Sequence, residues 1–172
     1  MVTGAGPLPT APGADPLLHG SAEHRIDGKA RLIVPAAFRG HFRPGKNAVV
    51  ISRHNFGCLG LWRGDVWQAK LADAYAVMND GPDEFERAQT LTWNSDPVDL
   101  DPQYRVTIPG DSRAYAHLEP DGGVRVVGAF DHIELWEPAS WEARNQAHLD
   151  KLRHEQRPMF PSRRALVGGG AA

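Results

Sequence analysis

The sequence contains one phrase written twice. HRIDGKARLIVPAAFR occupies residues 24–39 and VDLDPQYRVTIPGDSR occupies residues 98–113, at an offset of 74 residues. An aspartate, the arginine four places later, the proline after a short apolar run and a closing arginine all recur. These pairs are Asp27/Asp101, Arg31/Arg105, Pro35/Pro109 and Arg39/Arg113. Such a chain must adopt a fold that accepts two near-equivalent units.

The repeat continues at the same offset beyond these two phrases. GCLGLW at 57–62 corresponds to DHIELW at 131–136, and Trp67 corresponds to Trp141. Three blocks that keep one spacing indicate an internal duplication. Two copies are too few for a solenoid, so we predict a closed structure in which each half completes the other.

Each half has the same predicted order of elements: a strand, a tight turn, a second strand ending at proline, and a short helix. Asp27-Gly28 is a hairpin signal in which the glycine would accept positive φ, whereas Asp101-Pro102 uses proline to fix φ. Further strands are expected at 49–52, 59–62, 124–127 and 133–136, and helices at 65–78, from Pro82 and from about Pro138. The predicted fold class is α+β, a small barrel or sandwich of two pseudo-equivalent halves with helices outside.

Composition limits the class of protein and the domain boundaries. The chain has 172 residues, of which 41% are hydrophobic and 23% charged, as in globular domains. Residues 1–16 hold four prolines and three glycines, and they and residues 158–172 are predicted to be flexible tails. The first half would span 17–94 and the second 95–157. The start lacks the pattern of a secretion signal, no run suits a membrane span, and the one cysteine, Cys58, fits a reducing cytoplasm.

The two halves differ most in charge. Residues 24–46 carry six Lys or Arg against one Asp, a balance of +5, whereas residues 98–120 carry two Arg against four acids, a balance of −2. Basic residues needed only for packing would occur in both halves. We therefore expect the first half to carry the function that uses the positive charge.

Three basic residues flank or occupy the first turn: Arg25, Lys29 and Arg31, with the small Ala30 between the last two. A tip of this kind could enter a DNA groove, where arginine hydrogen-bonds to guanine and lysine neutralises phosphate. The alternative is an ordinary solvated loop, since short basic clusters are common.

The repeated Asp and Arg residues have a structural interpretation. Asp27, Asp101 and Arg105 are predicted to close their turns through an aspartate–backbone bond and a local salt bridge. Arg39 and Arg113 are expected to tie a helix to the barrel.

Enzyme and metal motifs are missing from the sequence. Eight histidines occur without HExxH, paired CxxC or GxSxG patterns. His132 is expected at the surface where a strand starts, and Cys58 is expected to be a buried structural thiol. We predict no catalytic residue, metal, cofactor or small-molecule substrate.

The motifs HRIDGKARLIVPAAFR, GCLGLW, LDPQYRVTIP and DHIELW resemble, in order and spacing, the MraZ family of bacterial transcription regulators, which have two AbrB-like halves. The likeness covers residues 17–150. It implies a swapped-hairpin barrel, a ring homo-oligomer and a nucleoid-associated repressor. Its DNA targets would be short G-rich direct repeats upstream of a division and cell-wall gene cluster. The family's DNA-reading turn falls on Asp27, Lys29, Ala30 and Arg31.

Three positions depart from the family pattern. The turn glycine is Ala30 in the first copy and Tyr104 in the second, and the family's early arginine is His19. If positive φ is needed there, alanine would be modestly strained and tyrosine predicts an altered turn. These departures leave two alternatives open: an oligomeric interaction protein that has lost or changed its DNA specificity, and an AbrB-type antitoxin that binds a toxin.

Overall fold

The computed structural model describes residues 6–7 and 17–155. Apart from Gly6–Pro7, the tails predicted at 1–16 and 158–172 lie outside the described residues. The chain divides into two compact units, Met1–Pro138 and Ala139–Ala172. The first unit holds both copies of the repeat, and within the described part of the second lies most of one helix, α5 (Pro138–His154).

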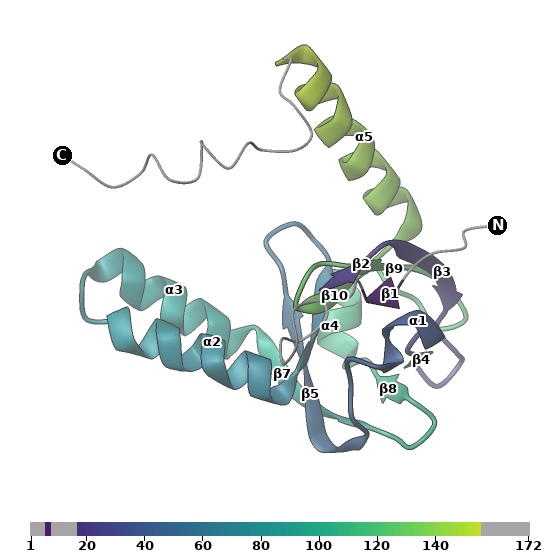
Figure 1. The fold of residues 1–172 in the computed structure, drawn as a ribbon, viewed down its shortest axis with the longest axis horizontal. Helices are drawn as coiled ribbons and strands as arrows, with labels where there is room; N and C mark the ends of the chain where they lie inside the picture. Colours follow the sequence, from purple (N-terminus) through teal and green to yellow (C-terminus); the bar gives the residue numbers. More distant parts are fainter. Residues whose placement is uncertain (1–5, 8–16, 156–172) are drawn as a thin grey trace. The chain divides into compact units, whose positions relative to one another are not determined.

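The first unit is built around an eight-stranded antiparallel sheet (Figure 1). Its strands are β3 (Ser21–Arg25), β4 (Arg31–Ile33), β5 (Gly45–Arg53), β6 (Leu59–Arg63), β7 (Ser95–Leu100), β8 (Arg105–Thr107), β9 (Gly123–Gly128) and β10 (His132–Trp136). The edge strands β3 and β4 meet through a bridge between Ile26 and Leu32, so the sheet forms a nearly closed barrel. A small separate ladder pairs β1 (Gly6–Pro7) with β2 (Leu18–His19).

Strands of the two halves alternate in pairs around the barrel. The order is β3-β9-β10-β6-β5-β7-β8-β4, so β9 and β10 lie between β3 and β6, while β7 and β8 lie between β5 and β4. Each half therefore fills a gap that the other leaves. This arrangement confirms the predicted α+β swapped-hairpin barrel.

The registers show how the duplication becomes symmetry. Leu32 pairs with Val106 across β4 and β8, and Gly60 pairs with Glu134 across β6 and β10. Both pairs join residues that are 74 positions apart in the sequence. A pseudo-twofold axis therefore passes through the two ladders where the halves meet.

Alternation along the strands separates an inner core from an outer surface. On β6, Leu59 and Leu61 belong to the barrel core, whereas Trp62 packs outside with Val50 and Trp67. Period-2 apolar spacing of this kind buries one face of each strand in the barrel.

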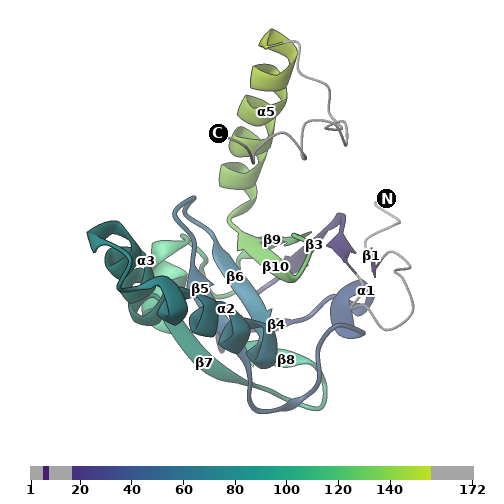
Figure 2. The same ribbon diagram turned by 60° about the vertical axis from the view of Figure 1, so that its left-hand side comes forward.

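Four helices accompany the barrel in the first unit: α1 (Ala36–Arg39), α2 (Gly64–Val77), α3 (Pro82–Trp93) and α4 (Gly110–Tyr115). Pro35 and Pro109 are the N-cap residues of α1 and α4. Helices α2 and α3 run side by side (Figure 2), and α3 begins at Pro82 as predicted. Trp67 of α2 lies on the outer surface of β6 and fixes the helical pair there.

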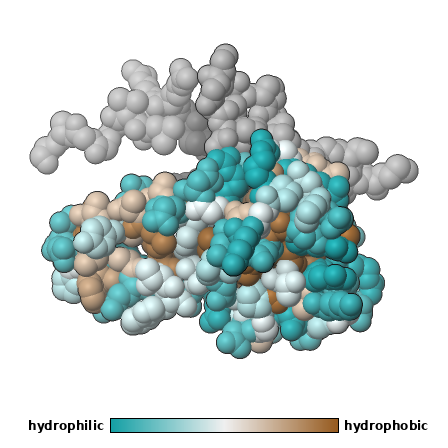
Figure 3. Space-filling model, turned by 90° about the horizontal axis from the view of Figure 1, so that it is seen from below, coloured by the Kyte–Doolittle hydropathy of each residue, from teal (hydrophilic) through white to brown (hydrophobic). Residues whose placement is uncertain are grey.

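An apolar groove of about 620 Å³ lies between α2 and α3. Its rim exposes large aromatic rings, with Tyr75 72% and Trp93 73% accessible. The brown area at the left of Figure 3 corresponds to this helical pair. Among the helices that the structure describes, none combines the length and apolar character needed to cross a bilayer.

Candidate nucleic-acid interface

The first repeated turn is a three-residue hairpin loop between β3 and β4. The amide of Ala30 donates to the carbonyl of Asp27 at 2.9 Å, and the amide of Asp27 donates to the carbonyl of Arg31 at 2.9 Å. This pattern fits a tight turn followed by one residue in the left-handed region. That residue is Ala30, with φ of 60°. The expectation that Gly28 takes positive φ is wrong, because the loop bond places the left-handed residue two positions later.

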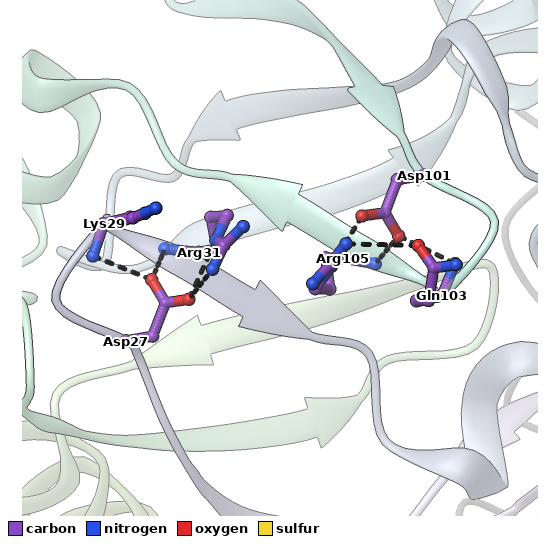
Figure 4. Close-up of polar contacts among 6 residues, drawn as sticks. All are labelled: Asp27, Lys29, Arg31, Asp101, Gln103 and Arg105. Carbon is purple, nitrogen blue, oxygen red and sulfur yellow. Dashed lines mark hydrogen bonds and ion pairs between the residues drawn. The ribbon is translucent and has the colours of Figure 1, made fainter.

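The Asp27 carboxylate organises this turn (Figure 4). Its Oδ1 accepts the backbone amides of Lys29 and Arg31, each at 2.9 Å. Its Oδ2 accepts the Arg31 side chain, with Nε at 2.8 Å and Nη2 at 2.7 Å. The Arg31 side chain, followed by these backbone bonds, lowers the pKa of Asp27 to about 2. The predicted structural role of Asp27 thus has a defined geometry.

The second turn repeats the first. Asp101 Oδ1 accepts the amides of Gln103 at 2.8 Å and Arg105 at 2.9 Å, while Oδ2 accepts Arg105 Nε at 2.6 Å. Tyr104 has φ of 61°, so the tyrosine does not produce the altered turn predicted from the sequence. Partial desolvation raises the pKa of Asp101, but the bonds from Arg105 and Gln103 outweigh it and the net shift is downward.

Each turn also supports the other half. The carbonyl of Tyr104 accepts the amide of Val34 at 2.9 Å, and the carbonyl of Ala30 accepts the amide of Ile108 at 3.0 Å. A left-handed residue turns its carbonyl away from its own hairpin, where the opposite strand end can use it. The strain of a non-glycine residue there, roughly 1–2 kcal/mol, is offset by contacts that join the halves.

Arg31 braces its turn through Nε as Arg105 does, although Arg105 Nη2 donates to Gln103 Oε1 at 3.1 Å whereas Arg31 Nη2 stays on Asp27. The Arg31 side chain is 32% exposed and held by Asp27, so the arginine that the family resemblance assigns to DNA reading is a brace of the turn. The charge of the two turns differs instead at Lys29, which corresponds to Gln103, and at Arg25, which corresponds to Asp99. Lys29 is exposed, and within residues 17–155 no carboxylate forms an ion pair with its ammonium group.

Arg25 lies at the end of β3, beside the turn, and is exposed. Its Nη2 donates to the carbonyl of Asp121, a residue of the β8–β9 half that is 96 positions away in sequence. The Asp121 carboxylate lies beside Gly28, 3.1 Å from where a Cβ would stand. The lack of a side chain at 28 leaves room for this carboxylate, and an acid from the second half therefore borders the basic tip.

The other arginines of the repeat hold helices to the barrel, as predicted. Arg39 Nε donates to the carbonyl of Val34 at 2.8 Å, and its guanidinium lies 5.5 Å from the centre of the Tyr104 ring. Arg113 Nε donates to the carbonyl of Ile108 at 3.3 Å. These contacts account for the recurrence of the closing arginine without DNA.

Two other predicted positions can be compared with the structure. Cys58 is buried, as expected. His132 is only 8% exposed, so the prediction of a surface histidine is wrong. Its ring stacks on Trp62 with centroids 3.7 Å apart, a tertiary contact between the halves that its neighbours in sequence do not reveal.

The low pKa of Asp27 leads to an expected pH dependence. A folded pKa of about 2 lies below the unfolded value of roughly 3.9. The ionised carboxylate therefore stabilises the fold above about pH 4, and this contribution disappears as pH falls toward 2. We expect Asp27→Asn to lower the melting temperature at pH 7, with the two proteins converging near pH 2. Circular dichroism melts across this range test it, and parallel curves would contradict it.

Comparison with known proteins agrees with this geometry. The family model described as "MraZ protein, putative antitoxin-like" matches residues 17–87 and 93–160. A protein of Thermomicrobium roseum named Transcriptional regulator MraZ is 35% identical over 130 residues, 76% of this chain and 87% of that protein. Those of Roseiflexus castenholzii and Kocuria rhizophila, with the same name, are 37% and 34% identical over 72% of this chain and 82% of each relative.

The matched ranges contain both repeated turns and the paired strands around them. The relatives are named as regulators of transcription, which agrees with the prediction that the chain is not an enzyme. From these matches and the swapped-hairpin barrel it follows that the chain belongs to the MraZ family.

Proposed function

We propose that this chain is a sequence-specific, double-stranded DNA-binding regulator of transcription that acts as a repressor. The observation that carries the proposal is the difference between two turns of equal geometry: only the first presents exposed cations, Lys29 and Arg25. A structural requirement would act on both turns alike. The difference therefore reflects a partner that carries negative charge.

The braced turn suits a DNA groove. Asp27 fixes the backbone at Lys29 and Arg31, so little conformational entropy is lost when the tip meets DNA. In our proposal Lys29 and Arg25 contact phosphates and base edges, Ala30 leaves room for the backbone to approach, and Arg31 holds the turn and offers its remaining N–H groups. The negative charge of Asp121 lowers the positive electrostatic potential at the turn. Nonspecific attraction to DNA is thereby reduced, which favours binding at specific sites.

The proposed operator is a set of short G-rich direct repeats upstream of a division and cell-wall gene cluster, bound in the nucleoid by a ring of subunits. The resemblance to the family suggests this layout. One tip with two or three cations binds weakly, but several tips on one assembly raise the avidity by roughly 10²–10⁴. Direct repeats are the arrangement that identical tips in a ring can occupy.

Salt dependence tests the proposal most directly. Binding of labelled direct-repeat DNA should weaken steeply as salt rises, with a log–log slope of about −2 for each engaged tip, since two phosphates per tip would each release counterions. Fluorescence anisotropy at several salt concentrations measures this slope. A random-site selection on the purified protein should enrich a repeated G-rich motif. Salt-independent binding, or no enriched motif, would exclude the function.

The apolar groove between α2 and α3 is our candidate surface for self-assembly, because Trp93 and Tyr75 are too exposed to serve the monomer. We expect Trp93→Ser to reduce the mass of the assembly without changing the melting temperature of the subunit. Sedimentation equilibrium measures the mass. Phe130→Ser, another ring that is 71% exposed, is the matched control. An unchanged mass in Trp93→Ser would remove this surface from the assembly.

The same groove favours a second candidate function, that of an oligomeric interaction protein or antitoxin whose partner is a protein. The brace on Arg31 and the acid at Asp121 both reduce the cationic character of the tip. A retained oligomer that shows no DNA preference in the selection would favour this candidate, and an enriched operator would exclude it.

A further inference from the structure

A cluster of side chains with lone pairs lies on the outer surface of the barrel, far in sequence from the DNA-reading turn. Atoms of His54, Cys58 and Glu134 that could each bind a metal all lie within 4.8 Å of one another. His54 and Cys58 belong to the β5–β6 connection, and Glu134 lies on β10 opposite Gly60. The cluster therefore forms where the two halves meet at the pseudo-twofold axis.

Glu134 occupies the centre of this cluster. Its Oε1 lies 3.8 Å from His54 Nδ1 and 3.9 Å from His132 Nε2. Its Oε2 accepts the indole N–H of Trp136 at 2.8 Å, which leaves Oε1 facing the two rings. The glycine at 60 makes the space, because a Cβ there would lie 2.5 Å from His54 Nε2.

His132 supplies an independent indication of a missing ligand. Its Nδ1 lies 2.9 Å from Asp131 Oδ1, and a carboxylate can only accept, so Nδ1 carries the hydrogen. Nε2 therefore presents a lone pair. This atom is buried, and no group among residues 17–155 hydrogen-bonds to it. The atom that it faces is another acceptor, Glu134 Oε1, and buried lone pairs left in this way are costly.

A zinc ion fits these distances. Zinc bonds of about 2.0–2.3 Å place tetrahedral ligand atoms roughly 3.3–3.8 Å apart. The separation of 3.8 Å between His54 Nδ1 and Glu134 Oε1 is at the upper end of that range. The three ligand atoms all lie within 4.8 Å of one another, so the longest separation would have to shorten by at most about 1.5 Å to reach the tetrahedral range.

We propose that this cluster is a zinc site in which His54, Cys58 and Glu134 bind the ion. A water molecule takes the fourth position and donates a hydrogen bond to Nε2 of His132. This assignment gives a partner to His132 Nε2 and places a cation beside the Glu134 Oε1 that it faces.

The donor set selects the metal. A thiolate with an imidazole and one carboxylate suits zinc, whereas calcium and magnesium prefer oxygen ligands alone. His54 lines a pocket of about 610 Å³ beside α2 and α3, which provides a route of entry.

The residues around the proposed ligands are also arranged as in other zinc sites. Asp131 orients His132 and also pairs with Lys70 of α2 at 3.0 Å. Carboxylates that orient histidines in this way tune metal binding and fix ring orientation. A bound ion would thus connect the β5–β6 connection of the first half to β10 of the second, beside the helix that packs on that face.

The test uses the untagged full-length chain, stripped with a chelator and titrated with Zn²⁺ and with Co²⁺. We expect one ion per chain and, with Co²⁺, the intense thiolate-to-metal absorption of a tetrahedral site. Cys58→Ser should remove this absorption. Both Cys58→Ser and His54→Gln should weaken zinc binding at least ~100-fold. His132→Phe, which keeps the stacked ring, should weaken it about 10- to 100-fold with the thiolate absorption retained.

His148→Gln, an exposed histidine on α5, is the matched control and should bind as the wild type does. Circular dichroism of the zinc-free variants establishes that each is folded. The site would be overturned if the wild type did not bind one zinc ion per chain. It would also be overturned if His54→Gln and Cys58→Ser bound zinc as tightly as the wild type does. A wild-type affinity for zinc in His132→Phe would overturn the role given to Nε2 of His132. All of these outcomes are read from zinc binding, so the test does not depend on the proposed DNA-binding function.

Discussion

Lys29→Gln is expected to abolish specific DNA binding while leaving the fold unchanged. The substitution gives the first turn the residue that the second turn already has, Gln103. The amide at position 29 still donates to Asp27, so the hairpin keeps its geometry. A contact to DNA is worth about 1–3 kcal/mol, so each engaged tip loses roughly 5- to 150-fold in affinity. In an assembly that uses several tips the losses multiply. Anisotropy titrations with repeat DNA measure the effect.

The equivalent turn supplies a control that few proteins offer. The double variant Lys29→Gln/Gln103→Lys has the wild-type net charge, with the lysine moved to the second turn. We expect it to bind as poorly as the single variant. If it recovers full specific binding, net charge rather than the first turn governs DNA binding, and the proposed site is wrong.

A second pair of variants separates the two roles of Arg31. Arg31→Ala and Arg105→Ala remove equivalent braces from Asp27 and Asp101, so they should lower the melting temperature by similar amounts. Only Arg31→Ala should lose DNA binding. Equal DNA binding by both variants would assign Arg31 to the turn alone and leave Lys29 and Arg25 as the contacts.

The architecture could be predicted because the signal for it is repeated along the chain. The constant offset of 74 residues predicts two equivalent halves, and the registers at Leu32–Val106 and Gly60–Glu134 show those halves meeting at equivalent residues. Proline at 82 marks the start of α3 for a local steric reason, so its position was also predictable.

Contacts between segments far apart in sequence could not be predicted. Asp121 borders the basic tip although it is 96 residues from Arg25, so a charge count over residues 24–46 misses it. His132 is buried because Trp62 of the other half covers it. The sequence around Arg25 does not indicate Asp121 as a neighbour, and the sequence around His132 does not indicate Trp62. Only the topology of the barrel brings the residues of each pair together.

The left-handed residue of the turns illustrates a different limit. Residue type favours Gly28 for positive φ, yet the loop hydrogen bond and the contact with the opposite strand place it at Ala30, and at Tyr104 in the second copy. A non-glycine residue in the left-handed region costs only roughly 1–2 kcal/mol. The backbone hydrogen bonds that fix the turn outweigh this cost. The family pattern, which has its turn glycine at the position of Ala30, predicts the left-handed residue correctly, whereas the Asp27-Gly28 hairpin signal does not.

Leu32→Ala is expected to destabilise the whole barrel. Leu32 is fully buried on β4, pairs with Val106 of the other half and bridges to Ile26 across the closure of the barrel. Removing a buried leucine side chain costs about 2–5 kcal/mol, which for a domain of this size lowers the melting temperature by about 10 °C. Thermal melts followed by circular dichroism measure it.

Ile33→Ala is the matched control, because Ile33 is the next residue on the same strand but is 45% exposed. Its cost should stay below about 1 kcal/mol. Since strands of the two halves alternate around the barrel in pairs, each half alone would keep only two-stranded ladders such as β5–β6 and β9–β10, which are marginally stable at best. Leu32→Ala should therefore still unfold in one transition, at a lower temperature. Two separate transitions would mean that the halves fold independently, and the swapped order of strands would then not be what holds the two copies together.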